Sequence, residues 1–220
     1  MSAAKAKIFI VDDHPLVREW LTNLIDQTSD LSVCGGAEDA KTALQAIGSS
    51  GAALAIIDLS LGGSSGIDLI RSIRASYPKV AMIVLSMHDE RVYAERSIRA
   101  GARGYIMKRE STKKIIDAIH EVLKGNMYLS KELTELFAEK FVSGAPANGD
   151  QPIAQLSDRE LEVFQLIGQG YETREIAKSL NVNIKTVQTY CTRIKDKLKF
   201  STGSELLREA VRWNEAHNAR

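Results

Sequence analysis

Side chains able to do chemistry follow short apolar runs at four places in the first half of this sequence. They are two adjacent carboxylates, a third carboxylate, a hydroxyl and an amine, namely Asp12 and Asp13, Asp58, Ser86 and Lys108. Continuous apolar runs are typical of strands buried on both faces, as in parallel sheets. Because ligands gather at the carboxyl ends of such strands, we expect these side chains to share one sheet edge.

Three carboxylates at one edge would repel one another and raise each other's pKa unless a cation lay among them. Mg²⁺ suits such a site, since it takes oxygen ligands, keeps several waters and bridges phosphate oxygens. Lys108 would add a second positive charge. The sequence therefore predicts a Mg²⁺ site in which Asp58 is the reactive group.

Each of these residues also has an ordinary structural interpretation. The aspartates after the first strand could cap a helix, Ser86 could belong to a turn, and Lys108 could be a solvated charge. That explanation requires all four strand ends to carry such groups by coincidence. It also leaves the repulsion among the acids unexplained, so the functional interpretation is favoured.

The segments that would position this site alternate between strand-like and helix-like patterns. Strands are expected over residues 7–11, 31–34, 54–57, 80–85 and 104–107, and helices over 15–25, 40–47, 67–77, 91–100 and 112–124. A glycine pair closes the second strand, and a turn-rich loop follows Asp58. This alternation predicts an α/β fold with a doubly wound, five-stranded parallel sheet of the flavodoxin-like type.

The last part of the chain is predicted to be a small all-α domain. Apolar residues at helical spacing predict helices over 161–167, 173–180, 184–198 and 204–214. Ser157 and Glu160 have the spacing of a capping box, Asn181 suits a left-handed turn residue, and Asn183 suits the next N-cap. Two short helices around a tight turn, the second polar and basic outside, predict a helix-turn-helix.

Between these parts lies a predicted connector. An amphipathic helix from Tyr128 to Val142, capped at Ser130, precedes a stretch rich in helix breakers that is expected to be a flexible linker. The predicted domains are therefore 1–125, a connector over 126–152, and 153–220.

The composition is that of an ordinary globular protein, with 44% hydrophobic and 26% charged residues. No apolar run is long enough to span a membrane, and no secretory signal is expected at the start. Cys34 and Cys191 fall in different predicted domains, so we expect no disulfide and a reducing, cytoplasmic setting. The net charge is only +1, but residues 184–199 hold five basic residues and one acid.

From Lys7 to Lys124 the chain resembles the receiver domain of two-component response regulators. The resemblance implies that a partner sensor histidine kinase phosphorylates Asp58. It also implies that Asp13, Asp58 and the backbone carbonyl of Ser60 bind Mg²⁺, with Asp12 acting through water.

The same resemblance implies roles in the response to phosphorylation. Lys108 would pair with the phosphoryl oxygens, Ser86 would move to hydrogen-bond the phosphoryl group, and Tyr105 would swing inward behind it. Packing within the sheet is an equally good interpretation of Tyr105. The chain departs from most receivers at Gly62, where they have proline, and from many at Arg109, where they have a cis proline. The first departure bears on loop rigidity and the second on the cis peptide, and neither removes a reactive group.

Residues 153–220 resemble the LuxR-type DNA-binding domain in four short motifs: Leu156-Ser157-x-x-Glu160, Ile176-Ala177-x-x-Leu180, Lys185-Thr186-Val187 and Lys197-Leu198. Behind a receiver, they make the whole chain resemble a response regulator of the NarL/FixJ type. We therefore expect a homodimer on double-stranded DNA in the active state. Ile184 and Tyr190 stand where many members have Glu and His, which bears on the target sequence.

The outer face of the helix over 184–198 carries the expected DNA contacts. The candidates for base edges, where Gln pairs with adenine and Thr offers its methyl to thymine, are Gln188, Thr189 and Thr192. The candidates for phosphates, which position but do not specify, are Lys185, Arg193 and Lys195. The helix over 204–214 fits a dimer contact and packing within its own domain equally well.

Three other functions fit parts of the sequence. A phosphatase of the haloacid dehalogenase kind would need Asp-x-Asp after the first strand, whereas Asp12 and Asp13 are adjacent. A nucleotide-binding module would need a glycine-rich loop there. A regulator that binds DNA without phosphorylation would not need the full set of strand-end residues. We therefore expect a regulator, not an enzyme, in which phosphorylation of Asp58 controls DNA binding and transcription.

Overall fold

The computed structural model of the chain describes residues 5–143 and 152–218. Its contacts divide the chain into two compact units, Met1–Glu139 and Lys140–Arg220. The division falls inside helix α6 (Lys131–Val142), which belongs to the predicted connector. Most of the expected flexible linker, residues 144–151, lies outside the described residues.

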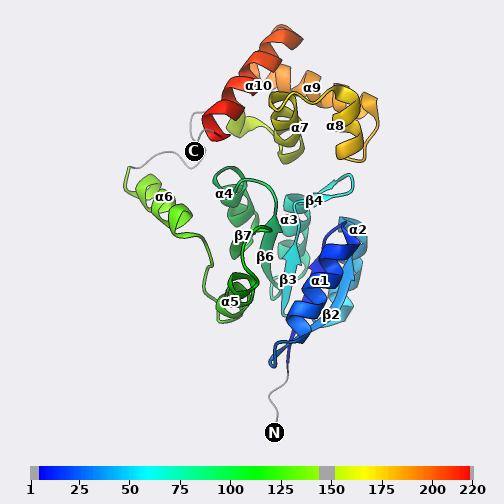
Figure 1. Cartoon of the computed structure of the whole chain (residues 1–220), viewed down its shortest axis with the longest axis vertical. Coiled ribbons are helices and arrows are strands. Elements are labelled where there is room, and N and C mark those ends of the chain that lie inside the picture. Colours follow the sequence, from blue (N-terminus) through cyan, green and yellow to red (C-terminus); the bar gives the residue numbers. More distant parts are fainter. Residues whose placement is uncertain (1–4, 144–151, 219–220) are drawn as a thin grey trace. The chain divides into compact units, whose positions relative to one another are not determined.

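The N-terminal unit is built on a five-stranded parallel sheet with the strand order β2-β1-β3-β6-β7 (Figure 1). The strands are β1 (Ala6–Val11), β2 (Leu31–Ala37), β3 (Leu54–Ile57), β6 (Ala81–Ser86) and β7 (Gly104–Met107). The chain order reverses between β1 and β3, and open α/β sheets bind ligands at such a point. The predicted doubly wound sheet is confirmed.

Helices cover both faces of this sheet (Figure 1). They are α1 (Pro15–Asp26), α2 (Ala40–Ser50), α3 (Gly66–Ser76), α4 (Glu90–Ala100) and α5 (Thr112–Leu123). Apolar side chains of α1 and α5 form one core with β1, β3, β6 and β7. Helix α3 packs between α2 and α4 against the other face. Burial from both sides explains the continuous apolar runs, since every residue of β3 is at most 2% exposed.

Strand β2 runs through Gly35 and Gly36 to Ala37, so the prediction that the glycines end it was wrong. A Cβ on Gly35 would lie 2.8 Å from the Phe9 ring on the neighbouring strand. Glycine therefore makes room for Phe9 instead of forming a turn. Helix α2 likewise continues past its expected end and stops before Gly51, whose φ is 68°.

The loop after Asp58 contains a small antiparallel hairpin, β4 (Ser60–Leu61) and β5 (Ser64–Ser65). Gly62 and Gly63 form its turn with φ values of 38° and 101°. Proline has a fixed negative φ and could not adopt this geometry at position 62. The departure from most receivers at Gly62 thus accompanies a different turn.

The C-terminal unit is helical, as predicted. It contains the short 3₁₀ helix η1 (Pro152–Gln155) and the helices α7 (Asp158–Gly168), α8 (Thr173–Ser179), α9 (Ile184–Leu198) and α10 (Gly203–Asn218). Ser157 and Glu160 form the capping box of α7. Asn181 has a φ of 50°, and the Asn183 side chain caps α9. The predicted turn chemistry is confirmed at both asparagines.

Helix α10 packs within its own unit and is longer than expected. Leu206 and Ala210 are buried, and the Trp213 ring lies edge-on to Phe164 of α7 at 6.0 Å between ring centroids. Leu207 remains 48% exposed. Packing within the domain therefore accounts for Leu206 and Trp213.

The start of α6 is tied to α4. The Ser130 hydroxyl accepts a hydrogen bond from the Leu133 N–H at 3.1 Å and donates one to Glu90 at 2.8 Å. Leu133 is buried, and Arg91 forms an ion pair with Glu132. The predicted cap at Ser130 is present, and the first turn of the connector helix belongs to the N-terminal unit.

None of the helices in the described ranges is long and apolar enough to cross a membrane.

Candidate functional site

The carboxyl ends of β1, β3 and β7 bring three of the expected site residues together. Lys108 Nζ lies 2.7 Å from Oδ2 of Asp12 and 2.8 Å from Oδ2 of Asp58. The two carboxylates are almost completely buried, and the Lys108 side chain is 11% exposed. One buried cation therefore bridges two buried acids at the point between β1 and β3 where the chain order of the sheet reverses.

The backbone around Asp58 is packed tightly against the start of α3. A Cβ on Gly66 would collide with the Asp58 carbonyl oxygen, so only glycine allows this approach. The Leu59 N–H donates to Asp58 Oδ1 at 2.7 Å, while Oδ2 accepts from Lys108. Both carboxylate oxygens are thus held in fixed positions.

Burial is the main influence on ionisation here. It raises the pKa of Asp58 above its usual value of 3.8, because desolvation disfavours the charge; Lys108 opposes this rise and Asp12 adds to it. Burial would also lower the pKa of Lys108, but the charges and hydrogen bonds of Asp58 and Asp12 outweigh it and raise that pKa above 10.5. Lys108 therefore stays cationic at neutral pH.

The acidic cluster has the donor set for a hard cation. Asp12, Asp13, His14 and Asp58 each offer a ligand atom, and these atoms lie within 4.8 Å of one another. Within the described ranges, Asp13 Oδ1 is a buried side-chain oxygen that accepts no hydrogen bond. His14 Nδ1 lies 2.7 Å from it, although not in hydrogen-bonding geometry. A buried carboxylate oxygen that accepts no hydrogen bond fits coordination to Mg²⁺.

The β4–β5 hairpin borders this cluster. The Gly62 N–H donates to Asp13 Oδ2 at 3.1 Å, a hydrogen bond that proline could not make. Ser60, whose carbonyl is an expected Mg²⁺ ligand, is the first residue of β4. Its hydroxyl lies 2.9 Å from His88 Nε2.

Ser86 and Tyr105 are both buried beside this edge. The Ser86 hydroxyl accepts a hydrogen bond from the His88 N–H at 3.2 Å, and the Tyr105 hydroxyl donates to the His88 carbonyl at 2.9 Å. Burial raises the pKa of Tyr105 above its usual value of 10, so its hydroxyl is a neutral donor. Tyr105 already occupies the inward position that the resemblance implied.

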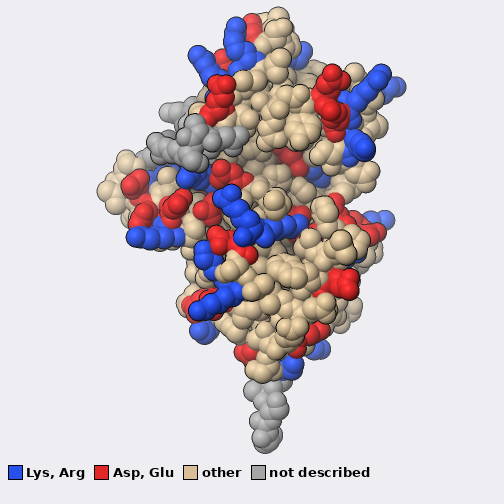
Figure 2. Space-filling view, in the orientation of Figure 1, with Lys and Arg blue, Asp and Glu red and all other residues tan. Residues whose placement is uncertain are grey.

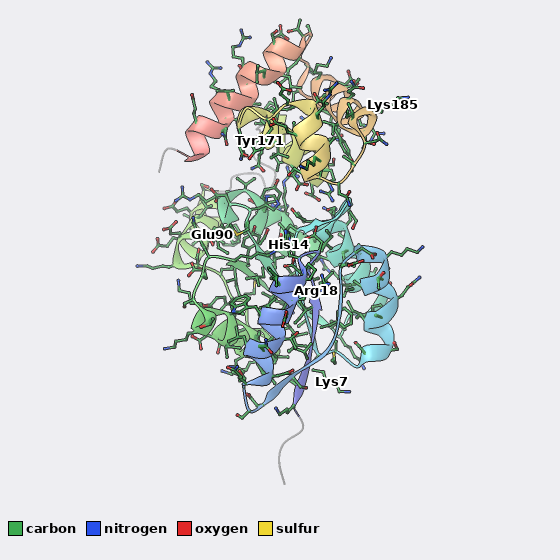
Figure 3. The ribbon with its side chains drawn as sticks, turned by 45° about the vertical axis from the view of Figure 1, so that its right-hand side comes forward. Lys7, His14, Arg18, Glu90, Tyr171 and Lys185 are labelled. Atoms are coloured by element: carbon green, nitrogen blue, oxygen red, sulfur yellow. The ribbon has the colours of Figure 1, made fainter. Side chains whose placement is uncertain are left out.

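Sequence reasoning missed three residues that contact this site. The Arg18 guanidinium donates to the Asp12 carbonyl at 2.6 Å, and the His14 N–H donates to Asp12 Oδ1 at 2.9 Å. Figure 3 shows His14 and Arg18 at the start of α1, with Lys7 at the opposite end of β1. The third residue is His88. Closeness in sequence to the expected site residues could have identified the two histidines, since His14 follows the aspartate pair and His88 closely follows Ser86.

A cavity of about 620 Å³ lies elsewhere, at the amino ends of β6 and β7, and is lined in part by Arg74, Lys79 and Arg103. None of the expected site residues lines it. The acidic cluster lies instead at the opposite sheet edge, at the carboxyl ends of the strands. Cavity size alone would therefore have pointed away from Asp58.

In the C-terminal unit, α9 presents the expected polar face. Its exposed residues include Lys185, Gln188, Thr189, Thr192 and Arg193, whereas Lys195 is half-buried. Val187, Ile194 and Leu198 on the other face are buried. Figure 3 shows Lys185 pointing away from the helices of its unit.

Three contacts refine the expected contributions of polar side chains on α9. The hydroxyls of Thr189 and Thr192 donate to the carbonyls of Lys185 and Gln188, one helical turn back. With its proton used in this way, each threonine can offer its methyl group and an acceptor oxygen outward. Lys197 Nζ lies 2.6 Å from Glu160 Oε2, so part of the basic run on α9 serves the fold.

Surface charge by itself does not mark the site. On the face seen in Figure 2, Lys and Arg side chains are interspersed with Asp and Glu on both units. This agrees with the net charge of only +1. A nucleic-acid contact would then depend on a local arrangement of basic side chains such as the outer face of α9.

Comparison with known families divides the chain in the same way. Residues 8–120 match the response regulator receiver domain. Residues 154–210 match the luxR family of bacterial regulatory proteins.

Relatives and solved structures match nearly the whole length. The oxygen regulatory protein NreC of Staphylococcus aureus is 35% identical over 210 residues, covering 94% of this chain and 97% of NreC. The RcsB response regulator of Salmonella typhimurium is 27% identical with a TM-score of 0.57, covering 94% of this chain and 98% of that one. RcsB bound to the promoter rprA in the presence of the phosphomimetic BeF₃⁻ is 25% identical with a TM-score of 0.60, covering 93% and 97%.

Proposed function

Because the chain belongs to the two-component response regulators that join a receiver domain to a luxR-type DNA-binding domain, we propose that Asp58 is its phosphoacceptor. A sensor histidine kinase would be the phosphodonor. The observation that carries this assignment is the bridge from Lys108 to Asp58 and Asp12, where the chain order of the sheet reverses. It supplies a buried nucleophile and a counter-charge at one place.

In the proposed reaction, a carboxylate oxygen of Asp58 forms a bond to phosphorus as the bond from phosphorus to the donor histidine breaks. The imidazole nitrogen leaves with the bonding electrons. Lys108 would exchange its contact with Asp58 Oδ2 for the phosphoryl oxygens. Phosphoryl transfer depends mainly on in-line positioning and charge neutralisation, which these fixed groups provide.

The proposed metal ion is Mg²⁺. Asp13, Asp58 and the Ser60 carbonyl would hold it directly, and Asp12 would act through water. When bound, it would supply positive charge for the phosphoryl oxygens. The buried Asp13 oxygen that lacks a hydrogen bond supports this ligand set.

Ser86 and Tyr105 would report the phosphoryl group to the rest of the receiver. The Ser86 hydroxyl accepts from the His88 N–H, and its own proton would be donated to a phosphoryl oxygen once one is present. Ser86 would move to hydrogen-bond the phosphoryl group, and Tyr105, which is buried in this structure, would pack behind it. The switch is thus a local charge event read by a change in packing.

The output would be DNA binding by α9 in the cytoplasm, where promoter DNA is reached. Gln188, Thr189 and Thr192 would contact base edges, and the phosphate contacts would be Lys185, Arg193 and Lys195. We also propose the domain limits 1–125, 126–152 and 153–220, and a homodimer as the active state. One solved RcsB structure is of two RcsB dimers bound to two parallel DNAs, which supports the dimer by similarity.

Incubation with a small phosphodonor and Mg²⁺ tests the assignment of Asp58. The wild-type chain should gain one acid-labile phosphoryl group, visible as a mass increase in intact-protein mass spectrometry. Asp58→Asn should abolish the gain, because an amide lacks the nucleophilic oxygen. Asp117→Asn, at an exposed position on α5, should leave labelling unchanged. Equal labelling of the Asp58 variant would refute the assignment.

A further inference from the structure

Four contacts converge on His88, which precedes α4. Its backbone N–H donates to the Ser86 hydroxyl, and its carbonyl accepts from the Tyr105 hydroxyl. Its Nε2 lies 2.9 Å from the Ser60 hydroxyl, and its ring centroid lies 4.7 Å from that of Tyr93. One residue therefore links the β4 strand to the proposed switch residues, Ser86 and Tyr105.

The Ser60 end of this link is a weak element by itself. Strands β4 and β5 have two residues each and are joined through two glycines with positive φ. An isolated hairpin is at best marginally stable in water, so its position depends on contacts with other segments. The His88 ring supplies one such contact at Ser60, the residue whose carbonyl is a proposed Mg²⁺ ligand.

The other end of the link is well fixed. Tyr93 is 3% exposed in α4 and limits the orientation of the His88 ring. The two backbone hydrogen bonds of His88 fix its main chain against Ser86 and Tyr105. A rigid support on one side and a weak hairpin on the other make the imidazole suited to set the hairpin's position.

We propose that His88 is a positioning residue for the metal site, acting through its side-chain hydrogen bond to Ser60. This proposal rests on the proposed Mg²⁺ site. Loss of the hydrogen bond would let Ser60 and its carbonyl drift from the acidic cluster. Since partners that orient metal ligands typically change affinity by 10-fold or more and one neutral hydrogen bond is worth somewhat less, we expect weakening of about 5- to 10-fold.

Variants separate this role from simple packing. His88→Phe keeps a ring against Tyr93 and removes the bond to Ser60, and Ser60→Ala removes the hydroxyl while keeping the backbone carbonyl. His88→Gln can place an amide group near the position of Nε2 and should restore much of the affinity. His120→Phe is the matched control, because His120 pairs with Asp30 next to the start of β2, at the opposite sheet edge.

The experiment titrates Mn²⁺ into each full-length variant and follows the free ion by electron paramagnetic resonance. Competition with Mg²⁺ then gives the Mg²⁺ affinity. His88→Phe and Ser60→Ala should each weaken binding by a similar factor. The double variant should bind no more weakly than either single variant, because both changes break the same bond. His120→Phe should match the wild type.

Three results would overturn the proposal: unchanged affinity in both single variants, effects that multiply in the double variant, or a His88→Gln variant as weak as His88→Phe. Circular dichroism checks that each variant is folded. If His88→Phe does not fold, the Mg²⁺ affinity of Ser60→Ala decides the test. Failure of the proposed function is distinguishable, since the wild type would then neither bind Mg²⁺ at the acidic cluster nor accept a phosphoryl group. In that case the role of His88 fails with it.

Discussion

At the scale of single residues, Asp58 is subject to two opposing effects. Burial raises its pKa, whereas the ammonium group of Lys108 at 2.8 Å stabilises its charge. A nucleophilic carboxylate must be ionised, so the lysine counteracts the cost of placing it in the sheet. The same lysine contacts Asp12, which lets one cation serve two acids.

Also at the residue scale, Lys185 and Gln188 should make different contributions to DNA binding. Lys185→Ala should weaken binding to all sequences and reduce the slope of log affinity against log salt by about 1, because one phosphate contact no longer releases a counterion. Gln188→Ala is its matched control on the same helix face. It should alter the preferred sequence in a randomised-site selection and keep the salt slope. An unchanged salt slope for Lys185→Ala would show that Lys185 does not contact a phosphate.

At the scale of elements, the start of α3 fixes the end of β3. Gly66→Ala would force a Cβ against the Asp58 carbonyl oxygen and displace either the helix or the strand end. We expect a loss of about 1–3 kcal/mol in the free energy of unfolding, as for other overpacked sites. Phosphorylation of Asp58 by a small donor should also be slower in this variant.

Chemical denaturation and labelling kinetics together test this expectation. Gly125→Ala is a useful comparison, because its φ of 89° is also positive but nothing lies near the added Cβ. That change should cost stability through backbone strain alone and leave the labelling rate intact. Equal labelling rates for the Gly66 variant and the wild type would show that α3 does not position Asp58.

The capping box of α7 gives a pH-dependent element in the C-terminal unit. Burial acts to raise the pKa of Glu160, but hydrogen bonds from Lys197 and from Ser157 outweigh it and lower that pKa below 4.5. A lowered folded pKa means that the ionised side chain adds stability above about pH 4.5 and that this stability is lost as the pH falls through the folded pKa.

Thermal unfolding of the full chain tests this sign. Glu160→Gln should be less stable than the wild type at pH 7, by roughly 1 kcal/mol, because a neutral amide loses its ion pair with Lys197. The difference should shrink as the pH falls below 4.5. A difference that stays constant from pH 7 to pH 3 would contradict the proposed role of ionised Glu160.

At the scale of the whole molecule, phosphorylation of one unit must change DNA binding by the other. We expect phosphodonor with Mg²⁺ to shift the chain toward a dimer and to strengthen binding to its selected DNA site by about 10-fold, a coupling free energy of about 1.4 kcal/mol. Light scattering after gel filtration gives the mass, and a DNA titration gives the affinity.

Asp58→Asn is the control for that experiment and should show neither change. If the fully phosphorylated wild type bound DNA with unchanged affinity, the alternative of a regulator that binds DNA without phosphorylation would stand. The contacts of Ser130 with Glu90 and of Glu132 with Arg91 place the start of α6 on α4, next to the loop that follows Ser86. That junction is a physical route by which the receiver could affect the connector.

The sequence by itself determined the alternation of strands and helices, the residues at the strand ends and the helix-turn-helix. These features are local, because periodicity, capping and turn chemistry act over a few neighbouring residues. Glu160 followed from its spacing to Ser157, and Asn183 from its place before an apolar run. Burial of the strands on both faces was visible in the same way.

Only the tertiary structure decided which distant groups meet. Lys108 contacts Asp12 and Asp58, Gly62 donates to Asp13, and Ser60 contacts His88, all across many residues of sequence. Gly35 was misassigned to a turn because the Phe9 ring that needs its space comes from another strand. Such contacts depend on strand order and on the filling of space between elements, and no local pattern encodes either.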